Sequence, residues 1–171
     1  TLSSSSAASD VYKRQAQRYA APAHIVSLRA GALCIPKGFN GARTLCFPVL
    51  NGKAVSTQWI RQKLFASRLA GGNDSTASLT EAWRDRGLEL GGYFNHPDLL
   101  AELESAQANA ESSHTHIIEL SNNNEPTPAI KSFCERSHAS WVSVSGEAFW
   151  QATEIGIIAT LPQAIAMSLP S

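Results

Sequence analysis

The sequence lacks a hydrophobic run long enough to cross a membrane. A helix that spans a bilayer needs roughly 20 consecutive apolar residues. The nearest candidate, IGIIATLPQAIAM at residues 155–167, is shorter than that and contains Pro162. Because proline interrupts a helix, this segment is expected to form a buried helix that kinks or stops there. We therefore expect a soluble protein with no membrane partner.

An excess of charge of either sign is also missing, and cysteine is scarce. Lys+Arg and Asp+Glu both number 14, so no net field draws the chain to nucleic acid, and such a contact would have to be local. Cys34, Cys46 and Cys134 are odd in number and widely spaced, which argues against a disulfide framework. This usage indicates a reducing compartment, so the expected localisation is cytoplasmic.

Common catalytic signatures are absent. The sequence contains no G-x-S-x-G, C-x-x-C or H-E-x-x-H motif, and no glycine-rich phosphate fingerprint of the dinucleotide or P-loop kind. No enzyme class can be assigned from the residues. A non-catalytic interaction or scaffold domain therefore remains one of the alternatives.

The first 15 residues are expected not to belong to the fold. Residues 5–15, SSAASDVYKRQ, resemble the translation of a transposase-type sequencing adaptor. The alternative is a natural Ser/Ala-rich disordered tail, and in both cases residues 1–15 are left out of fold prediction. We expect residues 16–171 to form a single α/β domain and the chain to be a fragment of a larger protein whose native N-terminus is missing.

The first part of that domain, residues 24–72, is expected to be rich in β-structure. HIVSLRAGALCI at residues 24–35 favours a strand, and two further strand-like runs, TLCFPVL and KAVSTQWI, are separated by Asn51-Gly52. Asparagine and glycine tolerate positive φ, so this pair predicts a type I′ hairpin turn. The result is an N-terminal β-hairpin region, with the strand that contains Pro48 at its edge.

The remainder predicts helices followed by a βαβα unit. In the helical connection at residues 78–112, Ser78 and Glu81 form a capping-box pattern, the helix is expected to end near Gly87, and Pro97 begins a second helix. Residues 114–168 then alternate HTHIIEL, PTPAIKSFCERSH, SWVSVSG and EAFWQATEIGIIATL. Strands that alternate with helices indicate parallel strands, so the predicted fold class is α/β with a C-terminal Rossmann-like unit.

Four side chains of the βαβα unit could approach one point and hold a metal ion. Residues two apart on a strand and four apart on a helix share a face, and the helix of a βα unit runs back beside its strand. Mixed His and Cys ligands suit tetrahedral zinc, so a structural zinc is one interpretation of His114, His116, Cys134 and His138. The alternative is two surface histidines, a buried cysteine, and a histidine favoured by the C-terminal helix dipole.

The carboxyl ends of the predicted parallel strands are the expected place for a ligand. Short polar loops there present backbone N–H groups at helix N-termini, which suit a small anionic ligand. The same residues could serve only to cap the helices. They are Ser121, Asn122, Asn123, Asn124, Ser145, Gly146 and Glu147.

Basic and aromatic residues alternate after the predicted hairpin. Such a pattern can stack bases and contact phosphates of single-stranded nucleic acid, although a solvated face with a buried phenylalanine is the alternative. The residues are Trp59, Arg61, Lys63, Phe65 and Arg68.

The same region carries a resemblance. Residues 44–72, TLCFPVLNGKAVSTQWIRQKLFASRLAGG, are similar in cadence to the middle region of phage- and plasmid-type Toprim DNA primases. The matching positions are Pro48, Gly52, Ser56, Gln58, Ile60, Lys63, Phe65, Gly71 and Gly72. In that family Ser-x-Gln-x-Ile is a strand, and the resemblance implies a Toprim fold with a Glu after its first strand and a later paired-Asp metal motif. Here HIIELSNNN lacks the Glu-Gly step and no Asp-x-Asp occurs, so no catalytic residue carries over.

These observations give one preferred hypothesis and two alternatives. The resemblance implies a non-catalytic or degenerate nucleic-acid-processing module, a primase-like fragment of a mobile element. The βαβα pattern instead favours a Rossmann-like domain that binds a small molecule or nucleotide. The missing catalytic motifs favour an interaction or scaffold domain.

Overall fold

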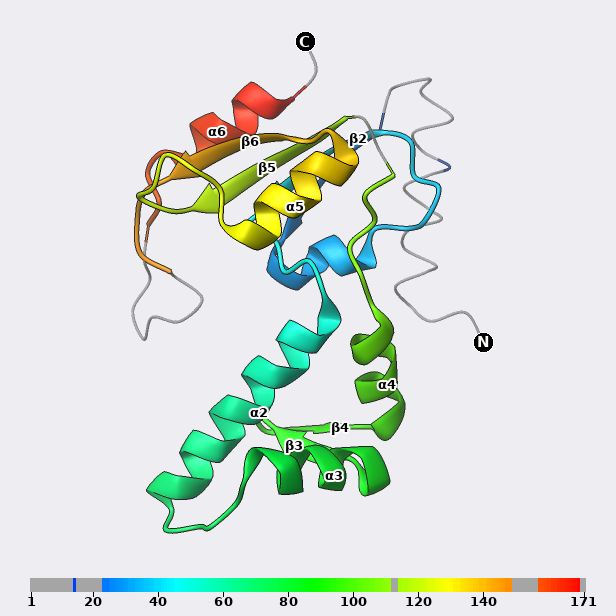
Figure 1. Ribbon diagram of the computed structural model, residues 1–171, viewed down its shortest axis with the longest axis vertical. Coiled ribbons are helices and arrows are strands. Elements are labelled where there is room, and N and C mark those ends of the chain that lie inside the picture. Colours follow the sequence, from blue (N-terminus) through cyan, green and yellow to red (C-terminus); the bar gives the residue numbers. More distant parts are fainter. Residues whose placement is uncertain (1–13, 15–22, 112–113, 149–156, 170–171) are drawn as a thin grey trace. The chain divides into compact units, whose positions relative to one another are not determined.

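The described residues form two compact units. The computed structural model describes Arg14 and residues 23–111, 114–148 and 157–169 (Figure 1). Unit 1 is built from the described residues of Thr1–Leu28, Lys37–Phe47 and Ala110–Ser171, and unit 2 from Arg29–Pro36 and Pro48–Asn109. We expected residues 16–171 to form a single domain. The described residues of this range are divided between the two units. Residues 1–13 and 15 lie outside the described residues.

Unit 1 contains a four-stranded parallel sheet. Its strands are β1 (His24–Leu28), β2 (Ala42–Cys46), β5 (Thr115–Leu120) and β6 (Ser140–Val144), in the spatial order β1-β2-β5-β6. Every neighbouring pair is parallel. The expected α/β fold class is therefore confirmed, and the strands predicted from HTHIIEL and SWVSVSG are β5 and β6.

Helices cover both faces of this sheet. Figure 1 shows α5 (Pro128–Ser137) on one face and α6 (Leu161–Ser168) on the other. Thr44 is in register with His116, and Cys46 with Ile118, so these four side chains share a face. A core cluster links this face to α6 and comprises Cys46, Phe47, Ile118, Val144, Ile158 and Ala164.

Unit 2 is mainly helical and contains its own core. It comprises η1 (Arg29–Cys34), α2 (Gly52–Leu69), α3 (Thr76–Arg86), α4 (Pro97–Ser105) and a hairpin of β3 (Leu88–Leu90) and β4 (Tyr93–Asn95). The core consists of Ile60, Leu79, Trp83, Leu90 and Leu100. Trp83 is the most buried of these residues, with 0% of its surface exposed.

The hairpin expected at Asn51-Gly52 is wrong, because KAVSTQWI lies in α2 instead of in a strand. Asn51 has extended φ and ψ of −141° and 143°, and its side chain accepts a hydrogen bond from Ala54 N at 2.8 Å. It therefore acts as a helix N-cap, a role that asparagine fills as well as a turn position. A β-hairpin is present at Gly91-Gly92, where φ values of 60° and 83° suit a type I′ turn.

Other expected boundaries shift by smaller amounts. The strand predicted for residues 24–35 ends at Leu28 and continues as η1. Helix α3 begins earlier than expected, because the capping box joins Ser75 to Ser78 and does not join Ser78 to Glu81. The helix ends before Gly87 as expected.

The end of the chain departs more clearly from the prediction. Most of the helix predicted from EAFWQATEIGIIATL, residues 149–156, lies outside the described residues. The helix that is described, α6, begins at Leu161, so Pro162 stands in its first turn instead of interrupting it. No helix in the described part of the chain is both long and apolar enough to cross a membrane.

Candidate functional site

Helix α2 carries charge of one sign. Its 18 residues include Lys53, Arg61, Lys63 and Arg68 and no aspartate or glutamate. The Asn51 cap begins the helix, and the helix ends shortly before Gly71 and Gly72. Because the carboxylates of unit 2 lie on other elements, α2 presents a local positive surface on a chain with no net charge.

Three exposed side chains lie along one stripe of α2. Arg61, Phe65 and Arg68 are four and three residues apart, a spacing that aligns side chains on one helix face. All three are exposed, and Phe65 exposes 66% of its surface. An exposed aromatic residue thus lies between two exposed arginines along one helix face, and we call these three residues the α2 outer stripe.

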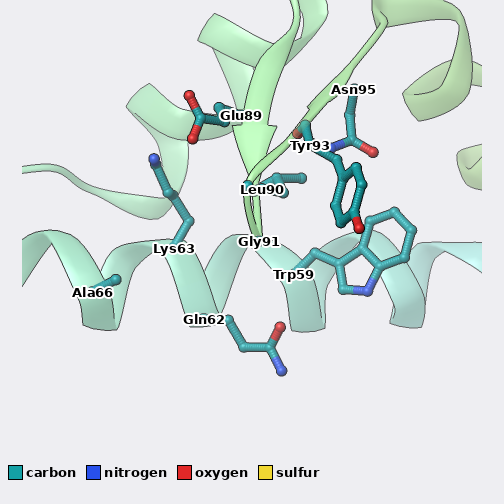
Figure 2. A pocket seen from close by; sticks show the side chains of 10 residues that line it. Trp59, Gln62, Lys63, Ala66, Glu89, Leu90, Gly91, Tyr93 and Asn95 are labelled. Atoms are coloured by element: carbon teal, nitrogen blue, oxygen red, sulfur yellow. Dashed lines mark hydrogen bonds between the residues drawn. The ribbon is translucent and has the colours of Figure 1, made fainter.

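A second feature of unit 2 is a cavity between α2 and the β3–β4 hairpin, with a volume of about 480 Å³. Figure 2 shows Trp59 and Lys63 reaching up from α2, and Tyr93 coming down from β4 on the side of Trp59. Glu89 also lines the cavity and lies on the side of Lys63 (Figure 2), so it offsets part of that cation's charge. The lining is therefore aromatic at one end and of mixed charge at the other. We call this cavity between α2 and the β3–β4 hairpin the hairpin cavity.

Packing inside unit 2 fixes the Trp59 indole. Its ring stacks on Trp83 with centroids 6.2 Å apart and an interplanar angle of 23°. Trp83 is held in turn by a hydrogen bond from its Nε1 to the His96 carbonyl oxygen at 3.1 Å. Tyr93, by contrast, is 79% exposed, so the cavity has one rigid and one accessible aromatic wall.

The five residues expected to contact nucleic acid all lie on α2 but fall into two groups. Trp59 and Lys63 line the hairpin cavity, whereas Arg61, Phe65 and Arg68 form the α2 outer stripe. The sequence interpretation missed Tyr93 and Asn95, which line the same cavity from β4. The Gly91-Gly92 pair followed by Tyr93 was the available signal, because a double glycine before an aromatic residue is typical of a hairpin.

The predicted metal ligands are brought together only in part. His114, His116 and His138 line one cavity at the amino ends of β2, β5 and β6, and Cys134 does not line it. Burial, with further contributions from Glu119 and Glu135, raises the pKa of the Cys134 thiol and so disfavours the thiolate that binds metal. Among the described residues, no three His, Cys, Asp or Glu side chains are placed to hold a metal ion.

This cavity, which we call the histidine cavity, also contains residues that sequence reasoning missed. Arg43 is on its wall although it is buried, with 1% of its surface exposed. Thr115, Ser140 and Ser168 add hydroxyl groups. Burial lowers the pKa of His116, whose Nδ1 lies 2.6 Å from Ser140 Oγ. No sequence signal identified Arg43, because the ARTLC strand mixes polar and apolar residues and contains no recognisable binding motif.

The predicted ligand loops follow β5 and β6 at neighbouring positions of the sheet. Asn122, Asn123 and Asn124 are exposed, and the backbone N–H of Asn123 donates to Ser121 Oγ at 3.0 Å. Ser145, Gly146 and Glu147 are exposed as well, and Ser145 lines a cavity of about 340 Å³ beside α6. The loops are thus close to each other, as parallel strands require.

No protein-family model, curated protein sequence or solved structure matches the chain.

Proposed function

We propose that unit 2 binds single-stranded nucleic acid along α2. In this proposal Arg61 and Arg68 contact backbone phosphates, and Phe65 between them stacks on a base. Trp59 and Tyr93 in the hairpin cavity provide a second stacking position. The role agrees with the non-catalytic, primase-like module of a mobile element that the resemblance of residues 44–72 implies, although the part of that segment likened to a strand is helical.

The observation that carries the proposal is an exposed aromatic ring on a helix that bears cations and no carboxylate. Burying an aromatic ring is normally favourable, so 66% exposure of Phe65 beside two arginines favours a surface that receives a planar partner. Base–aromatic stacking contributes about 1–3 kcal/mol per base and does not depend on sequence, and basic side chains follow the backbone. Arg61 and Arg68 are separated by about 10 Å along the helix, from a rise of 1.5 Å per residue.

Fluorescence anisotropy of a labelled oligo(dT) strand with the full chain, measured over a salt series, tests the proposal. Each phosphate contact contributes about −0.7 to the slope of log K against log [salt] for a single strand. The double variant Arg61→Gln/Arg68→Gln is expected to make the slope about 1.4 less negative. Phe65→Ala is expected to weaken binding by about 1–3 kcal/mol without changing the slope.

Arg86→Gln is the matched control, because Arg86 is an exposed arginine of unit 2 that lies on α3 and is not part of α2. It should leave both the affinity and the slope close to wild type. Binding that is absent, insensitive to salt, or reduced equally by all three variants would contradict the proposal. It would favour the interaction or scaffold alternative.

A second candidate function concerns unit 1. We propose that its sheet, covered by α5 and α6, is Rossmann-like and holds a small molecule or nucleotide near the carboxyl end of β6. The cavity lined by Ser145, Thr160 and Gln163 favours this position. Thermal shifts with a nucleotide panel should be lost in Ser145→Trp, which fills the cavity, and kept in Ser121→Trp. A flat response of the wild type to the whole panel would count against this candidate.

A further inference from the structure

We propose that the histidine cavity of unit 1 binds the phosphoryl group of a small phosphorylated molecule. The cavity has a volume of about 370 Å³ and lies at the amino ends of the strands, where β2, β5 and β6 begin. This is the edge of the sheet opposite the loops that sequence reasoning favoured. The inference is independent of nucleic-acid binding by unit 2.

Every ionisable side chain in the lining is basic. Arg43, His114, His116 and His138 contribute a guanidinium and three imidazoles, and Thr115 and Ser140 contribute hydroxyls. Within the described part of the chain, no aspartate or glutamate lines this cavity. A permanent positive charge beside several neutral donors disfavours a metal cation and favours an anion. The three histidines that suggested a metal centre therefore fit an oxyanion better.

Arg43 is the strongest evidence for a ligand. Its side chain is 1% exposed, its Nε donates to Thr115 Oγ1 at 2.7 Å, and its Nη2 is buried without a hydrogen-bond partner. Among the described residues, no carboxylate forms an ion pair with it. A buried charge without a counter-charge is costly, and a buried donor without an acceptor adds to that cost. An oxyanion in the cavity supplies both the charge and the acceptor.

The other donors are held in place by the protein. His116 Nδ1 and Ser140 Oγ are 2.6 Å apart, which fixes the imidazole ring near the start of β5. His138 caps the end of α5 in the left-handed conformation, with φ of 54°, and its side chain is exposed at the rim of the cavity. Arg43 and Thr115 lie on the sheet face opposite that of His116 and Ser140, so a ligand at this edge of the sheet takes donors from both faces and from the end of α5.

The volume leaves room for more than the phosphoryl group itself, so a phosphorylated sugar of modest size fits the site better than the free ion. Isothermal titration calorimetry of the full chain at pH 7 with inorganic phosphate and with ribose 5-phosphate tests this, with ribose as a third titrant. Saturable binding of both phosphates, and none of ribose, is expected. Tighter binding of ribose 5-phosphate would support a sugar phosphate as the ligand class, and equal binding would support recognition of the phosphoryl group alone.

Two variants and a control locate the binding. Arg43→Gln keeps a donor for Thr115 but removes the charge, and it should weaken phosphate binding by at least about tenfold. Because Arg43 is buried, this variant can also disturb the fold, so His138→Asn provides a second measurement on an exposed residue. Asparagine tolerates the left-handed conformation, and the loss of the imidazole should weaken binding by about threefold or more. His96→Asn, in unit 2, removes an exposed histidine and should leave phosphate binding unchanged.

Absence of saturable heat with both phosphates, or affinity that His138→Asn leaves unchanged, would overturn the inference. The phosphate-binding proposal can fail without the nucleic-acid proposal failing, because His138→Asn is expected to bind oligo(dT) as the wild type does. It can also fail without the second candidate failing, because neither Arg43 nor His138 lines the cavity beside Ser145.

Discussion

Thr44 lies in a chain of hydrogen bonds that connects β1 with α6. Ser168 Oγ donates to the Ile165 carbonyl oxygen at 2.7 Å, and a hydroxyl has a single proton to give. Thr44 Oγ1 must then donate to Ser168 Oγ at 2.6 Å, and His24 Nε2 must donate to Thr44 Oγ1 at 2.9 Å. This order places the imidazole proton on Nε2 and leaves His24 Nδ1 as a buried nitrogen without a partner.

That arrangement predicts how stability depends on pH. Burial lowers the pKa of His24 below its ordinary value of 6.5, so the unfolded chain binds more protons than the folded chain just below that pH. The contribution of His24 to stability is therefore present above pH 6.5 and lost as the pH falls through the lower folded-state pKa. Urea unfolding at pH values of about 5.5 and 7.5 should show lower stability in acid for the wild type.

The variant His24→Gln should reduce that difference, since glutamine can still donate to Thr44 but does not titrate. Gln62→Asn, at an exposed position of α2 without an ionisable group, is the control and should leave the difference as it is in the wild type. If His24→Gln shows the same dependence on pH as the wild type, the assignment of the effect to His24 is wrong.

Gly52 occupies a position that has no room for a side chain. A Cβ atom built at this position would collide with the Leu103 carbonyl oxygen and the adjacent backbone of α4. Backbone cannot move aside as a flexible side chain can, so Gly52→Ala should lower the free energy of unfolding by about 1–3 kcal/mol. Lys53→Ala, in the same turn but exposed, should stay within about 0.5 kcal/mol of wild type. Equal stability of the two variants in urea titrations would contradict the close approach of α2 and α4.

At the scale of elements, a strand residue caps the helix that follows it. Thr127 precedes α5 without a side-chain cap of its own, and Glu119 of β5 takes that role. Glu119 Oε2 accepts from Thr127 N at 3.2 Å and from Trp141 Nε1 at 2.8 Å. A carboxylate at a helix N-terminus also interacts favourably with the helix dipole. One buried side chain thus joins β5, α5 and β6.

Glu119→Ala should therefore destabilise the protein by about 2–4 kcal/mol, because it leaves the Trp141 indole N–H and the α5 N-terminus without their acceptor. Glu119→Gln keeps an acceptor oxygen and should cost about 1 kcal/mol. Glu147→Ala is the control, because Glu147 is exposed after β6, and its effect should be within about 0.5 kcal/mol. Urea titrations that rank Glu119→Ala with the control would show that these bonds do not support the fold.

Some helices and strands could be predicted from the sequence, and others could not. Strand β5 and strand β6 were identified because apolar, β-branched runs bounded by polar loops leave few alternatives. The end of α3 was predicted from the glycine at position 87, and in the structure Gly87 adopts a positive φ of 84°. The prediction at Asn51-Gly52 was wrong because asparagine favours both turns and helix N-caps, and here Asn51 is the N-cap of α2.

The residues of the candidate sites also divide into those that the sequence could predict and those that it could not. All five predicted nucleic-acid residues lie on one helix, since their spacing is local and survives a change from strand to helix. The buried charge of Arg43 was not predictable, because the strand pattern around it does not reveal which face is covered. Its significance depends on His114 and His138, which are far away in the sequence and meet it only through the order of the strands.

At the scale of the whole chain, most of unit 2 connects two neighbouring parallel strands. The chain leaves the carboxyl end of β2 and must return to the amino end of β5, and parallel neighbours always need such a crossover. Here residues 48–109 make that connection and enclose a core of their own around Trp83. Because this crossover encloses its own core, it can in principle fold without the sheet strands that it connects.

We therefore expect residues 48–109, prepared alone, to fold. A segment of roughly 60 residues is small, but many domains of that size fold independently. The tryptophans of this segment, Trp59 and Trp83, are stacked, so fluorescence reports its core directly. Urea should produce one cooperative transition, and Leu100→Ala should remove it, since truncating a buried leucine costs about 2–5 kcal/mol. The folded segment should also bind oligo(dT) with the salt slope of the full chain, because α2 and the hairpin cavity lie within it. A segment without a cooperative transition would show that its core depends on the rest of the protein.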